Sequence, residues 1–138
     1  MRLLITDPGA VVADYDDVVS LRAEDESGGF GIWPGHADFL TALTVSVVGW
    51  RHADGRQANC AVRRGVLSVQ GGQRIAIATR EAERGDDLDA LEASVLVRFK
   101  ADAESERTGR VAATRLHAET VRRIIDALRP DRQTGLGA

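Results

Sequence analysis

Cysteine, proline and aromatic residues are scarce in this chain, and long apolar runs are missing. Its 138 residues include one cysteine, three prolines and only 4% aromatic residues. A lone Cys60 cannot form an internal disulfide and has none of the neighbours of a metal site, so we expect it to be a small buried hydrophobe. No apolar run is long enough to span a bilayer, and Leu3-Leu4-Ile5 is too short for a signal peptide. We therefore expect a cytosolic protein, or one on the cytosolic side of a membrane complex.

The charge is nearly balanced along the chain. The formal net charge is −3, with no long run of one sign, which disfavours DNA or another polyanion as a partner. The acidic residues Asp14, Asp16 and Asp17 surround Tyr15 but lack the ligand spacing of a calcium loop. We expect them on the solvated surface.

The sequence motifs of common catalytic and cofactor sites are also missing. There is no GxxxxGK[ST] phosphate loop, and Gly28, Gly29 and Gly31 do not form a dinucleotide fingerprint. His117-Ala118-Glu119 matches only the first part of a deaminase signature, and no Gly-x-Ser-x-Gly elbow frames a serine. We therefore expect no catalytic residue, no metal ion and no cofactor.

Residues 1–85 have the pattern of a β-domain. Short apolar stretches at 18–21, 43–48, 66–69 and 75–78 read as strands, and turn residues separate them. Asp54-Gly55 and Gly71-Gly72 each suit a tight hairpin, because these residues tolerate positive φ. Many short strands at this spacing predict a sandwich or barrel. The fold class is therefore mainly β plus α, beginning with an N-terminal antiparallel β-sandwich.

Residues 86–130 have a helical period instead. Asp86 is a candidate N-cap, and Leu88, Leu91, Val95 and Phe99 fall on one side of the helix that follows. Gly109 is expected to break the chain before a second helix, which Pro130 ends. Residues 86–107 carry net charge −4 and residues 110–129 net charge +3, so the two helices are expected to form an antiparallel hairpin. Residues 131–138 are expected to be a flexible tail.

One segment stands out as a candidate docking loop. In Gly31-Ile32-Trp33-Pro34-Gly35-His36-Ala37, a large aromatic residue and an imidazole lie on a rigid turn at the end of the β-domain. Trp33 could simply pack on the core. Its alternative role is an interface anchor, since tryptophan is enriched at binding hot spots.

These residues resemble a known family. Gly31–Ala37 with Phe39-Leu40-Thr41-Ala42-Leu43 resembles the GIxPGHAxLLTAL segment of F-type ATP synthase epsilon subunits. Residues 64–70 resemble the family's GGxLEV strand, and residues 81–89 resemble its passage from the β-domain into the first C-terminal helix. The resemblance spans about residues 3 to 129, with its segments in the family's order. Trp33 replaces the commoner tyrosine, which is compatible with a divergent branch of the family.

The resemblance implies a non-catalytic rotor subunit of the central stalk. The β-domain would bind the gamma subunit and the ring of c subunits, coupling ion translocation to ATP synthesis. The helical hairpin would reach the alpha and beta subunits when it extends, and would then restrain ATP hydrolysis. The protein would be peripheral, on the cytoplasmic side of the bacterial inner membrane. The implied interface residues are Ser27, Gly28, Gly29, Phe30, Gly31, Trp33, Pro34, Gly35 and His36.

The ATP-binding motif of some bacterial relatives is altered here. The (I/L)DxxRA motif corresponds to Leu88-Asp89-Ala90-Leu91-Glu92-Ala93, so Glu92 stands where the arginine would be. A carboxylate beside a triphosphate is unfavourable, and we expect weak or absent ATP binding. The alternative to a stalk subunit is a β-sandwich interaction adaptor with a helical tail, unrelated to ATP synthase. Binding to gamma would separate these two readings.

Overall fold

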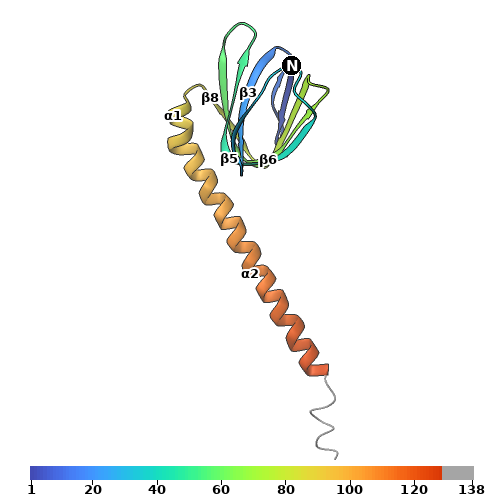
Figure 1. Ribbon diagram of the computed structural model, residues 1–138. Helices are drawn as coiled ribbons and strands as arrows, with labels where there is room; N and C mark the ends of the chain where they lie inside the picture. Colours follow the sequence, from blue (N-terminus) through green and yellow to red (C-terminus); the bar gives the residue numbers. More distant parts are fainter. Residues whose placement is uncertain (129–138) are drawn as a thin grey trace, which may run out of the picture. The chain divides into compact units, whose positions relative to one another are not determined.

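The computed structural model describes residues 1–128 and begins with a β-domain of eight strands (Figure 1). The strands are β1 (Arg2–Thr6), β2 (Val11–Tyr15), β3 (Val18–Asp25), β4 (Gly28–Ile32), β5 (Phe39–His52), β6 (Gln57–Gln70), β7 (Arg74–Thr79) and β8 (Ala82–Gly85). The four predicted strand segments lie within β3, β5, β6 and β7. Hairpin turns lie at Asp54-Gly55 and Gly71-Gly72 as predicted, and all three glycines have positive φ.

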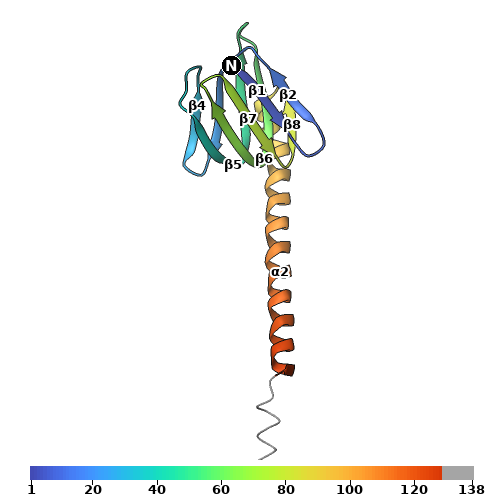
Figure 2. The same ribbon diagram turned by 90° about the vertical axis from the view of Figure 1, so that its right-hand side faces the viewer.

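The strands hydrogen-bond in the order β2-β1-β7-β6-β5-β3-β4, with β8 paired to β6 (Figure 2). Because β5 and β6 each have 14 residues, they are long enough to take part in both layers of a sandwich. The second half of β6 pairs with β7, and its first half pairs with β8. All pairings are antiparallel except β1 with β7, which is parallel. The predicted β-sandwich is confirmed, with this one parallel pair added.

A backbone kink marks the point where β6 changes partner. Arg64 has φ +62 and Gly65 has φ +148, both in the left-handed half of the φ range. A Cβ on Gly65 would lie 2.3 Å from the carbonyl oxygen of Ala78, so only glycine fits beside β7. The Thr79 hydroxyl donates a hydrogen bond to the Arg64 carbonyl and so satisfies a backbone group at the kink.

The interior of the sandwich is aliphatic. Strand alternation places one face of each strand inside, so that in β7 Ile75 and Ile77 are buried and Ala76 and Ala78 are exposed. Cys60 is fully buried in this core, as predicted, and burial raises the pKa of its thiol to about 11. The thiol is therefore protonated at neutral pH and behaves as a hydrophobe.

The helical region begins with α1 (Leu88–Ala90), continues through a π-helical turn η1 (Leu91–Val95) and then α2 (Leu96–Leu128). The N-cap is Asp87, one residue after the predicted Asp86, and its carboxylate accepts a 3.0 Å hydrogen bond from the Asp89 N–H. Of the predicted apolar stripe, Leu91, Val95 and Phe99 are buried, whereas Leu88 is exposed.

The predicted break at Gly109 is wrong. Helix α2 runs continuously through this residue, so one helix is present where a two-helix hairpin was expected. Glycine inside a helix costs about 1 kcal/mol relative to alanine, which is too little to end a helix of strong formers that has no proline between residues 86 and 129. Apolar side chains that a hairpin would bury, such as Val111, Val121 and Ile125, remain exposed.

The described residues divide into two units, 1–102 and 103–128. The first unit contains the sandwich together with the first turns of the helical region. The predicted tail, 131–138, and Pro130 lie outside the described residues. Within residues 1–128, no helix has the length and apolar character needed to cross a membrane.

Candidate functional site

The predicted interface residues begin on the β3–β4 hairpin. Asp25, at the end of β3, accepts hydrogen bonds from the backbone N–H and the hydroxyl of Ser27 and, at 2.8 Å, from the hydroxyl of Thr41 on β5. These bonds, led by that from the Ser27 hydroxyl, lower the pKa of Asp25. The hairpin turn is thereby tied to β5, and Gly28 with φ +117 completes it.

The loop of residues 33–38 is anchored to the β6–β7 hairpin. The Gly35 N–H donates to the Gly72 carbonyl at 2.9 Å, and the Asp38 carboxylate accepts from the Gly71 N–H at 2.9 Å. A Cβ on Gly72 would lie 2.8 Å from the Cα of Gly35, so the two backbones touch where glycine leaves room. The loop is therefore held by the scaffold and is suited to present side chains in a fixed arrangement.

Trp33 does not enter the core, so the core-packing reading is wrong, while its role as an interface anchor stays a prediction. Its side chain is 57% exposed and folds over Gly31, where a Cβ would lie 2.7 Å from the indole ring. At the start of β5, the ring of Phe39 contacts Phe30 at 5.6 Å and His36 at 5.8 Å between centroids. The structure therefore brings Phe30 and His36 together around Phe39, while Trp33 is offered to solvent.

Several exposed apolar residues next to this loop were missed by sequence reasoning. Leu40 is 71% exposed and Val66 is 48% exposed. The pairing register puts both on the outer face of β5, β6, β7 and β1. We name the apolar residues of this surface, which lie around the polar Ser68, the apolar face; they are Leu4, Leu40, Ala42, Val66, Ala76 and Ala78. The sequence carries a signal for this surface. In Phe39-Leu40 and Val66-Leu67 two consecutive strand residues are apolar, and because neighbouring side chains point to opposite faces, one of each pair must point outward.

The opposite side of the sandwich holds the first helical turns. Leu91, Val95 and Phe99 pack against Ala61, with Val45 and Val47 at the edge of the cluster. Leu91 fits because Gly85 has no side chain, since a Cβ there would lie 2.9 Å from a Leu91 methyl. This contact couples the end of β8 to the start of the helical region.

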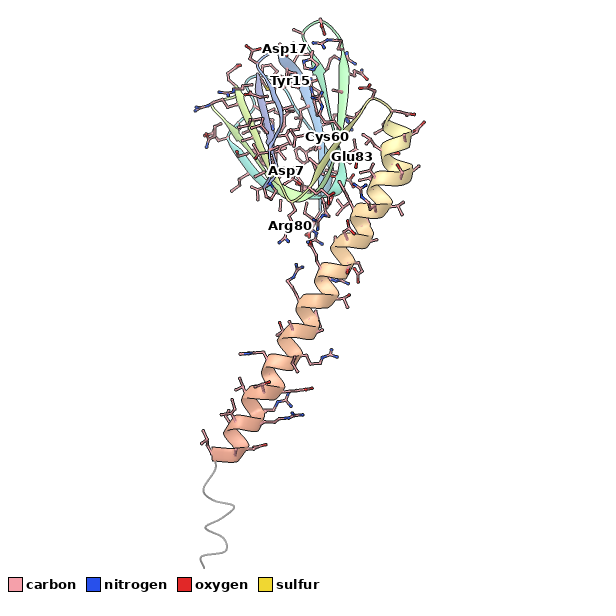
Figure 3. The ribbon with its side chains drawn as sticks, turned by 180° about the vertical axis from the view of Figure 1, so that it is seen from behind. Asp7, Tyr15, Asp17, Cys60, Arg80 and Glu83 are labelled. Atoms are coloured by element: carbon pink, nitrogen blue, oxygen red, sulfur yellow. The ribbon has the colours of Figure 1, made fainter. Side chains whose placement is uncertain are left out.

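An ion-pair network closes this helix–sheet contact. Arg98 donates to Glu83 at 2.7 Å and lies 3.5 Å from Glu81, which in turn lies 3.3 Å from Arg63. Glu83, labelled in Figure 3, comes from β8. These partly exposed pairs contribute little energy individually, and they fix the rotation of the helix more than they stabilise it.

Asp17 has a more specific role than the expected solvated surface. The Trp50 N–H donates to Nε2 of the buried His52, so Nδ1 of His52 carries the proton and donates to Asp17 at 2.8 Å. This bond lowers the pKa of Asp17. Figure 3 shows Tyr15 and Asp17 near one end of the sandwich and Arg80 near the other. Asp14 and Asp16 are exposed, as expected, and Asp14 is ion-paired to Arg2 at 3.3 Å.

The altered ATP motif lies on α1 and η1. Glu92, in place of the motif's arginine, is an exposed side chain of η1. Among residues 1–128, no three His, Cys, Asp or Glu side chains form a group that could hold a metal ion. The geometry of these residues offers packing surfaces and ion pairs.

Comparison with known proteins identifies the family. Residues 1–85 match the family model described as the ATP synthase delta/epsilon chain, β-sandwich domain. The chain belongs to this family. The matched residues are those of the sandwich, and they include the Gly31–Ala37 segment.

Relatives of the delta/epsilon family match over almost the whole chain. An ATP synthase epsilon chain 2 of Paraburkholderia xenovorans is 46% identical, covering 96% of this chain and 95% of the relative. A protein of the same name from Cereibacter sphaeroides is 40% identical, covering 98% and 91%. A chain in a Euglena gracilis mitochondrial ATP synthase structure has a TM-score of 0.60 at 18% identity, covering 75% of this chain and 64% of that one. At this identity, the likeness shows a shared fold and nothing more.

Proposed function

We propose that this chain is a non-catalytic rotor subunit of the central stalk of an F-type ATP synthase, coupling ion translocation to ATP synthesis. The observation that carries the proposal is the similarity to proteins named ATP synthase epsilon chain along nearly the whole chain. The subunit is peripheral, on the cytoplasmic side of the bacterial inner membrane, and its domains are the sandwich at 1–85 and the helical region that follows.

The apolar face supports docking on the gamma subunit. It joins Leu40 and Val66 to small side chains on neighbouring strands, giving a flat surface that another protein can approach closely. The anchored loop with Ser27–Gly31 and Trp33–His36 supports a second contact, with the ring of c subunits. Here small residues and an exposed indole allow close packing.

The helical region supports a regulatory role. Apolar side chains along residues 111–128 are exposed, and they could be buried against the alpha and beta subunits. In that position the helix would restrain ATP hydrolysis. Glu92 supports regulation without ATP as a ligand, because its charge opposes a triphosphate.

The test is titration of the full chain into a cognate alpha-beta-gamma complex lacking this subunit, with binding and ATP hydrolysis followed together. We expect binding that Leu40→Asp weakens by at least about tenfold, because a charge would be buried in the contact. The matched control is Val19→Asp, which places the same charge on another exposed valine, on β3 and outside the apolar face.

Each outcome has a distinct meaning. Binding with a fall in hydrolysis supports both roles, and truncation after Asp102 should then restore the rate while keeping the packed first turns of the helix. Binding without a fall retains the stalk role and removes the inhibitory one. Failure to bind at micromolar concentration would exclude the stalk role and leave the interaction adaptor.

A further inference from the structure

Part of the outer sheet face next to the helix remains uncovered. On this face β5 and β6 present the register pairs Val47–Ala61, Gly49–Asn59 and Arg51–Gln57 in succession. The first pair lies under Leu91, Val95 and Phe99, while the next two extend beyond this cluster. β3 adds Arg22 opposite Gly49 and Ser20 opposite Arg51.

These residues form a groove with a volume of about 170 Å³. We name it the arginine groove; its lining includes Ser20, Arg22, Gly49, Arg51, Gln57 and Asn59. Its floor is open because position 49 is glycine. A Cβ there would lie 3.1 Å from the side-chain oxygen of Asn59 and would reduce the space.

The two arginines of the groove differ in their ion pairing from other arginines of the described residues. Within residues 1–128, Arg22 and Arg51 form no ion pair, in contrast to Arg2, Arg56 and Arg98. Both side chains are exposed, so their charge is available to a ligand. The amides of Gln57 and Asn59 and the hydroxyl of Ser20 add neutral hydrogen-bond donors.

We propose that the arginine groove binds acidic side chains of a partner polypeptide. A guanidinium presents a planar fork of donors that matches a carboxylate, and two such forks with amides beside them suit two neighbouring acids. The cavity is smaller than the sites that enclose drug-sized ligands, which disfavours a nucleotide.

The backbone around the groove favours carboxylates over free phosphate. Phosphate sites typically use backbone N–H groups from a nest or a helix N-terminus. Gly49 is instead paired in the sheet with Arg22 on one side and Asn59 on the other, so the donors come from side chains. Trp33 lies on the same face of the sheet as Arg22, because its ring covers Gly31, the register partner of Arg22. A partner could thus contact the indole and the arginines together.

The test is an NMR titration of the full chain with a short capped peptide containing three glutamates. A peptide with glutamines in their place is the matched control, and inorganic phosphate is a separate arm. We expect the glutamate peptide to shift the backbone amides of Arg22, Gly49 and Arg51 saturably. The effect should fall strongly at about 1 M salt, where charges are screened beyond about 3 Å.

Charge-removing variants sharpen the test. Changing Arg22→Gln and Arg51→Gln together should weaken peptide binding by at least about tenfold, and Arg74→Gln, an exposed arginine on β7, should leave it unchanged. Equal loss with Arg74→Gln, shifts outside the groove, or no saturation would overturn the proposal. Tighter binding of phosphate than of the peptide at these amides would also overturn it, in favour of a small-anion site. None of these outcomes depends on binding to gamma.

Discussion

The helical region contains two stretches with similar residue types and opposite environments. Leu91, Val95 and Phe99 are 4%, 7% and 0% exposed, whereas Leu116 and Leu128 are 65% and 75% exposed. The first stretch belongs to the unit that includes the sandwich, and the second lies in residues 103–128. An apolar stripe in the sequence therefore predicts a surface that can be buried, but not where it is buried. The stripe at residues 91–99 is buried within its own unit, and the apolar side chains of residues 103–128 are available to a partner.

Two glycines extend the same contrast to the backbone. Gly65 lies at the kink of β6 in a conformation and a space that exclude a side chain, while a Cβ at Gly109 would meet no atom within 4 Å. Glycine is thus required in the sandwich and only tolerated in the helix. Replacement by alanine should therefore destabilise the protein at position 65 and stabilise it at position 109, and measuring both variants tests this difference.

The largest effect is expected from Gly65→Ala. The new methyl would lie against the Ala78 carbonyl, and alanine would be strained at φ +148, so β6 and β7 would have to separate. We expect the free energy of unfolding to fall on the order of 4 kcal/mol, or the sandwich not to fold. Urea unfolding followed by fluorescence of the buried Trp50 measures this. Gly55→Ala, also at positive φ but in open space, is the control for strain alone. An equal loss there would refute the role of the close approach.

A smaller loss is expected from Phe99→Ala. Phe99 is fully buried against Ala61, Leu91 and Val95, and its removal leaves a cavity or undocks the first helical turns. The cost should be about 3 kcal/mol. Leu116→Ala is the matched control and should change the free energy of unfolding by less than about 0.5 kcal/mol, because Leu116 is exposed. Urea unfolding of both variants, with amide exchange near Ala61, checks the pair. Equal losses would mean that residues 103–128 also have a packed surface in the isolated chain.

Much of the sandwich follows from the sequence because local signals there agree with one another. The alternation at 75–78 and the Gly71-Gly72 turn both specify a β-hairpin, and β6 and β7 form it. The parallel β1–β7 pair was not predictable in this way. It pairs residues that are far apart in the chain, and a local sequence pattern does not specify which strands become neighbours.

The candidate site was predictable as a loop but not as a surface. The Gly31–His36 segment is recognisable from its residues, and the structure anchors it as a presenting loop. The apolar face and the arginine groove are assembled from register partners on several strands, such as Arg22 with Gly49 and Gly49 with Asn59. Such surfaces depend on which strands pair and in which register, and the pattern of residues along the sequence does not specify either. The break at Gly109 failed for a related reason, because a single weak helix former does not outweigh its neighbours.

The smallest effect, and one of opposite sign, is expected from Gly109→Ala. A continuous helix gains about 1 kcal/mol when alanine replaces an interior glycine, since the unfolded chain loses conformational freedom and no contact obstructs the methyl. Amide exchange of the residues flanking position 109 in the full chain should slow by about fivefold. A hairpin turn with Gly109 at positive φ would respond in the other direction, because alanine would strain it. Faster exchange in the variant would therefore restore the hairpin as the solution state, and slower exchange would establish that one helix passes through Gly109.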